Sequence, residues 1–193
     1  MTSHYYSESQ ESNFKPFIIQ HGELEFYSAA GVFSKMKLDK ASLLLANKAL
    51  IPEEGSVLDL GCGIGTIGII IKNENPSLDV TFSDVNERAL KLTRMNLEKN
   101  GLKGVVKKSY LFENIKEEYN VIISNPPIAS GKKVCFQLIK DSWKYLKTNG
   151  CLQIVARHKK GGETLSKKIE EVFGNVEEVA KGSGFRIYKG VKK

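Results

Sequence analysis

Residues 56–66 read Ser-Val-Leu-Asp-Leu-Gly-Cys-Gly-Ile-Gly-Thr, and this stretch decides the fold. A short apolar run leads into a cluster of glycines, and residues 66–73 then follow with a helical pattern. A strand, a tight turn and a helix in this order form the first half of a βαβ unit. Gly61, Gly63 and Gly65 allow the backbone to turn sharply and to approach a ligand, because glycine has no Cβ. The stretch therefore predicts a parallel sheet with a ligand-binding loop at the end of one strand.

The alternation of short apolar runs and longer helical segments continues through the rest of the chain. It is typical of a doubly wound α/β fold, whose mostly parallel sheet is covered by helices on both faces. The last two runs form a hairpin that adds an antiparallel pair at one edge of a seven-stranded sheet. The expected strands are residues 56–60, 79–83, 105–108, 120–124, 151–156, 176–180 and 185–189, and the expected helices are residues 66–73, 87–99, 133–146 and 162–173.

The first quarter of the chain follows a different pattern. Residues 1–13 are polar and without a period, which predicts a flexible N-terminal tail. Two strand-like runs follow within residues 17–27, around a turn at His21-Gly22, and then a helix with Asp39 as its N-cap that stops at Pro52. We expect the hairpin and helix of residues 14–52 to cap a ligand-binding domain formed by residues 53–193, within a single compact domain.

The composition is that of an ordinary globular protein. Its 193 residues include 29 Lys and Arg against 22 Asp and Glu, a net charge of +7, and 41% are hydrophobic. This hydrophobic content excludes a disordered chain, and the longest apolar stretch, residues 67–71, is far shorter than the roughly 20 residues of a membrane span. Three scattered cysteines form neither a disulfide framework nor, with the histidines, a metal-ligand pattern. We therefore expect a cytoplasmic protein with no metal and no membrane segment.

Two carboxylates end the predicted strands beside the glycine loop. Asp59 lies two residues before Gly61, where it can accept hydrogen bonds from a cationic amino group. Asp84 ends the second strand, about 20 residues after the loop, where an acid can bind both hydroxyls of a ribose. Alone, Asp84 is equally explained as the N-cap of the next helix. The spacing of Gly63, Gly65 and Gly68 also matches the dinucleotide-binding pattern, but that pattern has no acid at position 59.

A third group of polar acceptors follows the strand of residues 120–124. Asn125 is followed by Pro126 and Pro127, which fix the backbone and remove two backbone donors. The carbonyls of this rigid corner and the Asn125 side-chain oxygen can converge on an –NH2 group and direct its lone pair at an electrophile. A structural Pro-Pro turn at the end of a buried strand explains the same residues.

At these motifs the sequence resembles the class I S-adenosylmethionine-dependent methyltransferases, which have a Rossmann-like fold. Residues 59–65 match the cofactor loop of that family, Asp84 its ribose acid, and Asn125-Pro-Pro127 the motif of enzymes that methylate exocyclic or amide nitrogens. Within the family the sequence is most similar to small-domain enzymes of the ribosomal RNA guanine-N2 type, including short archaeal members. Residues 31–34 and 38–39 resemble the segment that precedes the first helix of this subgroup. The resemblance extends over residues 15–190.

The resemblance implies a cofactor, a reaction and roles for individual residues. The cofactor is S-adenosylmethionine, and the reaction is methyl transfer to an exocyclic amine, most simply guanine N2 of RNA. Asn125, Pro126 and Pro127 would hold the amine, and Phe33 and Ile128 would contact the substrate. The residues expected to contact the cofactor are Asp59, Gly61, Gly63, Gly65, Asp84, Val85, Leu111 and Asn125.

Two positions depart from the pattern of the family. Ile128 stands where an aromatic residue often stacks on the target base, so stacking would have to come from another side chain such as Phe33. Tyr110 replaces an acid that often contacts the adenine amine of the cofactor. Adenine recognition would then depend on the apolar side chain of Leu111 rather than on a carboxylate.

The positive charge is consistent with a polyanionic partner, and the resemblance implies that this partner is RNA of the ribosomal or transfer class. Pairs of lysines that fit phosphate contacts are found at 132–133, 159–160 and 192–193, although such charges also occur on solvated faces. A protein-glutamine or DNA-adenine methyltransferase could use the same Asn-Pro-Pro corner. An NAD-dependent oxidoreductase and a non-catalytic nucleic-acid-binding module are two further alternatives, which the acids and Asn125 argue against.

Overall fold

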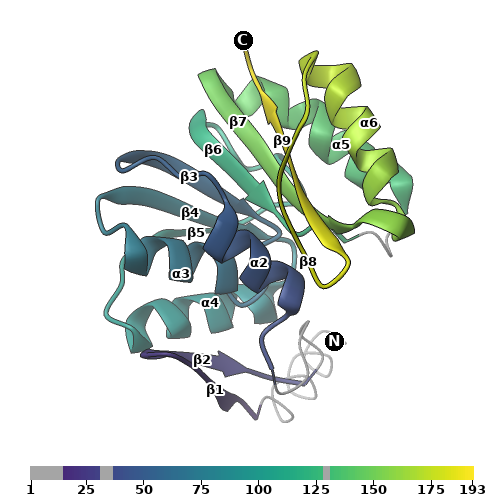
Figure 1. The fold of residues 1–193 in the computed structure, drawn as a ribbon. Coiled ribbons are helices and arrows are strands. Elements are labelled where there is room, and N and C mark those ends of the chain that lie inside the picture. The colour runs from purple at the N-terminus through teal and green to yellow at the C-terminus, as the bar shows by residue number, and fades with distance from the viewer. Residues whose placement is uncertain (1–14, 31–36, 128–130) are drawn as a thin grey trace, which may run out of the picture.

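The computed structural model describes residues 15–30, 37–127 and 131–193, and a seven-stranded sheet lies at its centre (Figure 1). The strand order is β5-β4-β3-β6-β7-β9-β8, and β9 runs antiparallel to both of its neighbours. A separate two-stranded hairpin, β1 and β2, precedes the sheet. The sheet strands are β3 Gly55–Leu60, β4 Leu78–Asp84, β5 Val105–Lys108, β6 Tyr119–Ser124, β7 Leu146–Arg157, β8 Glu177–Gly182 and β9 Phe185–Val191, and the hairpin strands are β1 Phe17–His21 and β2 Leu24–Ser28.

Helices cover both faces of the sheet, with α2, α3 and α4 on one face and α5 and α6 on the other (Figure 1). Successive residues of a strand point to opposite faces, so Val57 of β3 packs into the core beneath α2–α4 and Leu58 into the core beneath α5 and α6. The doubly wound α/β fold expected from the sequence is therefore confirmed. The helices are α2 Lys40–Lys48, α3 Thr66–Glu74, α4 Glu87–Lys99, α5 Lys132–Ser142 and α6 Gly162–Phe173.

The segment between α5 and β7 differs from the sequence prediction. A helix was expected over residues 133–146, but α5 ends at Ser142 and a 3₁₀ turn, Trp143–Tyr145, follows. β7 begins at Leu146 rather than at Cys151, because Leu146 pairs with Tyr119 before a bulge in the ladder. The first residues of β7, Lys147–Asn149, are exposed and polar, and they therefore lack the apolar pattern by which a buried strand is recognised.

Side chains of α4 attach the β1–β2 hairpin to the rest of the molecule. Asn96 exchanges two hydrogen bonds with the backbone of Tyr27, and Asn100 exchanges two with the backbone of Glu25. Each amide side chain thus makes the two hydrogen bonds that a neighbouring strand would make to β2, and backbone groups that would otherwise be unpaired are satisfied. Within the described part of the chain, no helix combines the length and the apolar character that a membrane crossing requires.

Candidate active site at the carboxyl ends of β3, β4 and β6

The sheet brings the three predicted polar groups together at the carboxyl ends of its central strands. β3 lies between β4 and β6 and runs parallel to both, so the carboxyl ends of all three strands lie side by side. Asp59 lies near the end of β3, Asp84 ends β4, and Asn125 directly follows β6. After β3 the chain adds β4 and β5 on one side of this strand and then β6 and β7 on the other side. Ligands of doubly wound sheets bind in the crevice outside such a switch point.

The glycine loop after β3 presents open space on its outer side. Gly61, Gly63 and Gly65 have φ angles of 73°, 58° and 84°, a region that side-chain-bearing residues rarely adopt. The backbone N–H groups of Gly61 and Cys62 both donate to the carbonyl of Ser83, at 2.8 and 2.9 Å. A Cβ placed on Gly61 or Gly63 would have no atom within 4 Å. A ligand can therefore lie directly against the backbone of the loop.

Asp59 is completely buried beneath this loop and only half paired. Its Oδ2 accepts a hydrogen bond from the Gly68 N–H at 2.9 Å, while its Oδ1 has no hydrogen-bond partner among the described residues. The pKa of the Asp59 carboxyl is raised to about 7, because burial and, to a smaller extent, the charge of Asp84 outweigh the lowering effect of the Gly68 hydrogen bond. A buried acceptor without a partner destabilises the fold, and a cationic group bound here would donate the missing hydrogen bond to the Asp59 Oδ1.

Asp84 joins the end of β4 to the glycine loop. Its Oδ2 accepts from the Gly63 N–H and its Oδ1 from the Asn86 N–H, both at 2.9 Å. A carboxylate oxygen has more than one acceptor site, so these bonds fix the orientation of Asp84 without using all its capacity. The N-cap of α4 is Asn86, whose side chain accepts from Arg88, and not Asp84. The alternative explanation of Asp84 as a helix cap is therefore wrong.

The residues proposed to cover the nucleoside lie beside Asp84. Val85 follows it directly and is 56% exposed, which is high for an apolar side chain. The loop after β5 reaches the same place because the Ser109 N–H donates to the Asp84 carbonyl. Leu111 in this loop has a φ of 48°, and its carbonyl accepts from the Ser109 hydroxyl. Tyr110 points its side chain largely into solvent, at 48% exposure.

Two polar residues of α4 support the loop and were missed in the sequence. The Thr93 hydroxyl donates to the carbonyl of Gly63, and the Asn96 amide donates to the carbonyl of Ile64, both at 2.9 Å. Both side chains are fully buried. The available signal was their position on the otherwise apolar face of α4, where a polar side chain needs a partner.

The acceptor corner is held in one orientation. Asn125 donates both available hydrogen bonds of its amide nitrogen, to the Asp39 Oδ2 at 2.9 Å and to the Ser42 hydroxyl at 3.1 Å. With the nitrogen held by these two bonds, the Asn125 Oδ1 is left as an acceptor, and within the described residues it accepts no hydrogen bond. Pro126 is buried and Pro127 is exposed.

Asp39 therefore has two functions in the fold, of which the sequence indicated one. It is the predicted N-cap of α2, since its Oδ2 accepts from the Ser42 backbone at 2.8 Å. The same oxygen orients Asn125, which lies 86 positions further along the chain. No local pattern could indicate this second contact, because it depends on how α2 packs beside the end of β6.

A comparison with protein families identifies the fold and its class of chemistry. The family described as "Methyltransferase small domain" matches residues 23–189. The chain belongs to this family. The small-domain methyltransferases transfer the methyl group of S-adenosylmethionine, and the present chain is accordingly an S-adenosylmethionine-dependent methyltransferase.

Two relatives and one solved structure are similar to this chain over most of its length. The uncharacterized protein YbxB of Bacillus subtilis is 39% identical over the full length of both chains. The ribosomal RNA small subunit methyltransferase C of Psychromonas ingrahamii is 36% identical over 97% of this chain. This chain spans only 54% of that relative. The T. thermophilus 16S rRNA N2 G1207 methyltransferase, solved with AdoMet and guanosine, superimposes with a TM-score of 0.78 at 24% identity over 93% of this chain and 51% of its own.

The site of this small-domain methyltransferase fits the cofactor of its family. The unpaired Asp59 Oδ1 and the open faces of Gly61 and Gly63 are features that a bound amino acid moiety would complete. Phe33 and Ile128, expected to contact the substrate, lie outside the described residues. In the described ranges, no group of three or more His, Cys, Asp and Glu side chains is placed to hold a metal ion.

Proposed function

We propose that this methyltransferase modifies the exocyclic N2 amine of guanine in ribosomal RNA. The observation that carries the proposal is the fixed orientation of Asn125, whose nitrogen is bound by Asp39 and Ser42 and whose oxygen is left to accept. Relatives that carry the name ribosomal RNA small subunit methyltransferase C, and the guanosine in the T. thermophilus structure, support guanine in RNA as the substrate.

The acceptor corner supplies position rather than acid–base chemistry. The Asn125 Oδ1 and the Pro126 carbonyl accept the two amine protons, which directs the nitrogen lone pair along one line. S-adenosylmethionine supplies an electrophilic methyl group on its sulfonium. The amine loses its extra proton after transfer, so no general base is needed beforehand. Alignment of this kind can lower a barrier by about 7–11 kcal/mol.

The carboxylate beside Asn125 favours guanine over adenine. Within the described residues, the hydrogen bonds to the Asp39 side chain all go to its Oδ2, which leaves its Oδ1 as an acceptor. Guanine has an N1–H donor next to its N2 amine, whereas adenine has an unprotonated acceptor at N1. A carboxylate near the bound amine would attract the guanine edge and repel the adenine edge. This argues against the DNA-adenine alternative.

The proposed cofactor contacts follow from the geometry of the same edge. Asp59 would bind the cationic amino group, the loop glycines would lie against the amino acid moiety, Asp84 would bind the ribose, and Val85 and Leu111 would cover the adenine. The cap formed by residues 14–52 and a cytoplasmic location remain predictions, as do the substrate contacts of Phe33 and Ile128.

Transfer of a labelled methyl group to total RNA, total DNA and total protein, in parallel reactions, tests the proposal. We expect label in RNA, recovered as N2-methylguanosine after digestion. Asp39→Asn is the informative variant, since asparagine also caps a helix well but lacks the charge. Its transfer to guanine should fall about tenfold or more. Label recovered as N6-methyladenosine, or as methylglutamine in protein, would instead establish one of the alternatives.

A further inference from the structure

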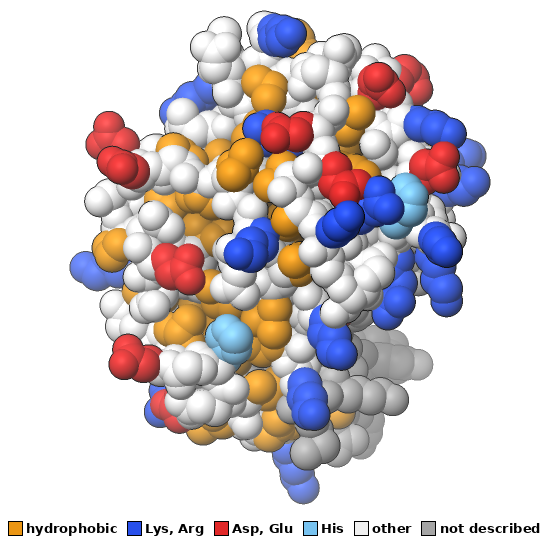
Figure 2. Space-filling view, in the orientation of Figure 1, with side chains coloured by type: hydrophobic (Ala, Val, Ile, Leu, Met, Phe, Trp, Pro, Cys, Tyr) orange, Lys and Arg blue, Asp and Glu red, His pale blue; other side chains and the backbone are white. Residues whose placement is uncertain are grey.

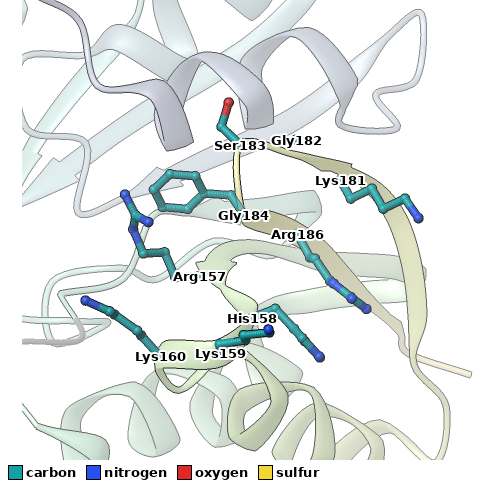
Figure 3. A pocket seen from close by; sticks show the side chains of 10 residues that line it. Arg157, His158, Lys159, Lys160, Lys181, Gly182, Ser183, Gly184 and Arg186 are labelled. Atoms are coloured by element: carbon teal, nitrogen blue, oxygen red, sulfur yellow. The ribbon is translucent and has the colours of Figure 1, made fainter.

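A cavity of about 530 Å³ lies on the far side of the acceptor corner from the cofactor loop. It is formed where β7 ends and the β8–β9 hairpin turns, and Figure 3 shows the side chains around it. In the sheet, β6 lies between β3, which carries the glycine loop, and β7, which leads into the cavity. The cavity therefore borders the substrate side of the acceptor corner. The lining residues are 157–160 and 181–186.

The register of the sheet gives the separation between the cavity and Asn125. Ser124 of β6 pairs with Ile154 of β7, so Arg157 lies two positions further along its strand than Asn125 along its own. With strands roughly 4.8 Å apart and a rise of roughly 3.3 Å per residue, the two Cα atoms are roughly 8 Å apart. The cavity is thus within reach of nucleotides that flank a base held at Asn125.

Five cationic side chains and no acidic side chain line the cavity. Arg186 is paired with Glu178 just outside it. Within the described part of the chain, Lys159, Lys160 and Lys181 are exposed and have neither a hydrogen bond nor an ion pair through their side chains. Some lysines elsewhere on the surface are paired with acids, as Lys167 is with Glu163, and others, such as Lys48 and Lys144, are exposed without an ion pair to any described residue. Figure 2 shows Lys and Arg side chains gathered over the end of β7 and the β8–β9 hairpin.

The walls of the cavity are rigid enough to hold these charges in place. The guanidinium of Arg157 lies over the Phe185 ring, 4.5 Å from its centre, which leaves its N–H edges available for an anion. Ser183 and Gly184 both have positive φ, 50° and 79°, as a two-residue type I′ hairpin turn requires. The His158 N–H donates to the Gly184 carbonyl at 3.2 Å, which ties the hairpin to the end of β7.

The lysines at the C-terminus do not belong to this group. β9 is antiparallel to β7, so Lys192 lies near the start of β7, at the other end of the strands from the cavity. There its Nζ donates to the Leu146 carbonyl and lies over the Trp143 ring. Of the lysine pairs that the sequence indicated as phosphate contacts, only 159–160 lines the cavity, joined by Lys181 and Arg157.

From this placement we propose that the Arg157–Lys160 segment and the β8–β9 turn bind backbone phosphates of an RNA next to the target nucleotide. The proposal rests on the proposed function for the identity of the nucleic acid. Unpaired cations, a stacked arginine and a rigid cavity beside the acceptor corner are what a phosphodiester chain would need. The binding energy comes largely from release of counterions and falls as salt rises.

Binding of a fluorescein-labelled RNA hairpin of about 20 nucleotides, with unpaired guanines in its loop, tests the proposal over a series of salt concentrations. The test variant is Lys160→Ala/Lys181→Ala. The matched control is Lys48→Ala/Lys144→Ala, which removes the same charge from exposed lysines towards the other end of the strands. We expect the test variant to bind about tenfold or more weakly at low salt, and its slope of log K against log salt to decrease by about 2. The control should bind RNA and transfer methyl groups as the unaltered protein does.

The outcomes separate this proposal from the proposed function. If the test variant and the control bind RNA equally, the phosphate site is wrong, even if the protein methylates RNA. If the test variant alone loses affinity while no methyl group reaches RNA in any reaction, the phosphate site is supported and the proposed function fails. An S-adenosylmethionine titration of both variants shows that each is folded.

Discussion

The environment of Asp59 departs strongly from that of a free side chain. With a pKa of about 7, its carboxyl is protonated in the free protein below neutral pH. A cationic amino group binds the carboxylate form, so binding below pH 7 requires loss of a proton. We expect the affinity for S-adenosylmethionine to weaken as the pH falls from 8 to 6. Calorimetry in buffers of different ionisation enthalpy measures the released proton directly.

Asp59→Asn provides the control for this pH dependence. Asparagine retains an acceptor for the Gly68 N–H but cannot ionise, so the affinity of the variant should be lower and nearly independent of pH over the same range. If the variant shows the same pH profile as the unaltered protein, the titrating group lies elsewhere in the site.

Asn125 is expected to affect transfer much more than cofactor binding. Its side chain lies at the end of β6, outside the glycine loop, and it contacts Asp39 and Ser42. Asn125→Ala removes one acceptor for the target amine, so kcat should fall about 10²-fold or more while the cofactor dissociation constant changes little. Single-turnover methyl transfer and calorimetry measure the two quantities.

Two substitutions of Asn125 distinguish a role as hydrogen-bond acceptor from a role as part of a structural turn. Asn125→Asp keeps an acceptor and adds a charge, and partial transfer by this variant would support the acceptor role. Full transfer by Asn125→Ala would show that the Asn-Pro-Pro sequence serves only to turn the chain.

At the scale of elements, the closest packing in the site lies between α3 and β4. A Cβ on Gly68 of α3 would lie 2.4 Å from the Phe82 ring and 3.1 Å from the Asp59 Oδ2. Gly68→Ala should therefore destabilise the protein by about 1–3 kcal/mol and weaken cofactor binding, because α3 must move away from Asp59. Urea denaturation and cofactor titration measure the two effects.

A second substitution tests whether the ring of Phe82 is the obstacle. Phe82→Leu makes room beside Gly68, so the double variant should lose less stability than the sum of the two single variants. If the stability losses of the two single variants simply add in the double variant, the Gly68 substitution destabilises the protein through a contact other than that with Phe82.

Elements with a clear apolar period were predictable to the residue, and the others were not. The sequence predicted α4 and α6, each of which buries one face, with the bounds that the structure has. The start of β7 was missed because Lys147, Thr148 and Asn149 are exposed at the end of the sheet. Local pattern identifies an element only where one of its faces is buried.

The same distinction applies to the site. Asp59, Asp84 and Asn125 could be placed together because each ends a strand of one parallel sheet, and the carboxyl ends of such strands share an edge. Their partners could not, since Asp39, Thr93 and Asn96 reach the site through contacts between elements distant in sequence. The phosphate-binding surface needed the sheet order as well, because only the antiparallel direction of β9 separates Lys192 from the other lysines.

At the scale of the whole molecule, Asn96 connects the β1–β2 hairpin to the glycine loop. One side chain binds the backbone of Tyr27 in β2 and the carbonyl of Ile64 in the glycine loop. Cofactor that orders the loop should therefore slow hydrogen exchange in residues 24–28 of the hairpin as well. Mass spectrometry of peptides with and without cofactor should show this protection there, and none in residues 146–150 at the opposite edge of the sheet. The hairpin would then report cofactor occupancy at a distance.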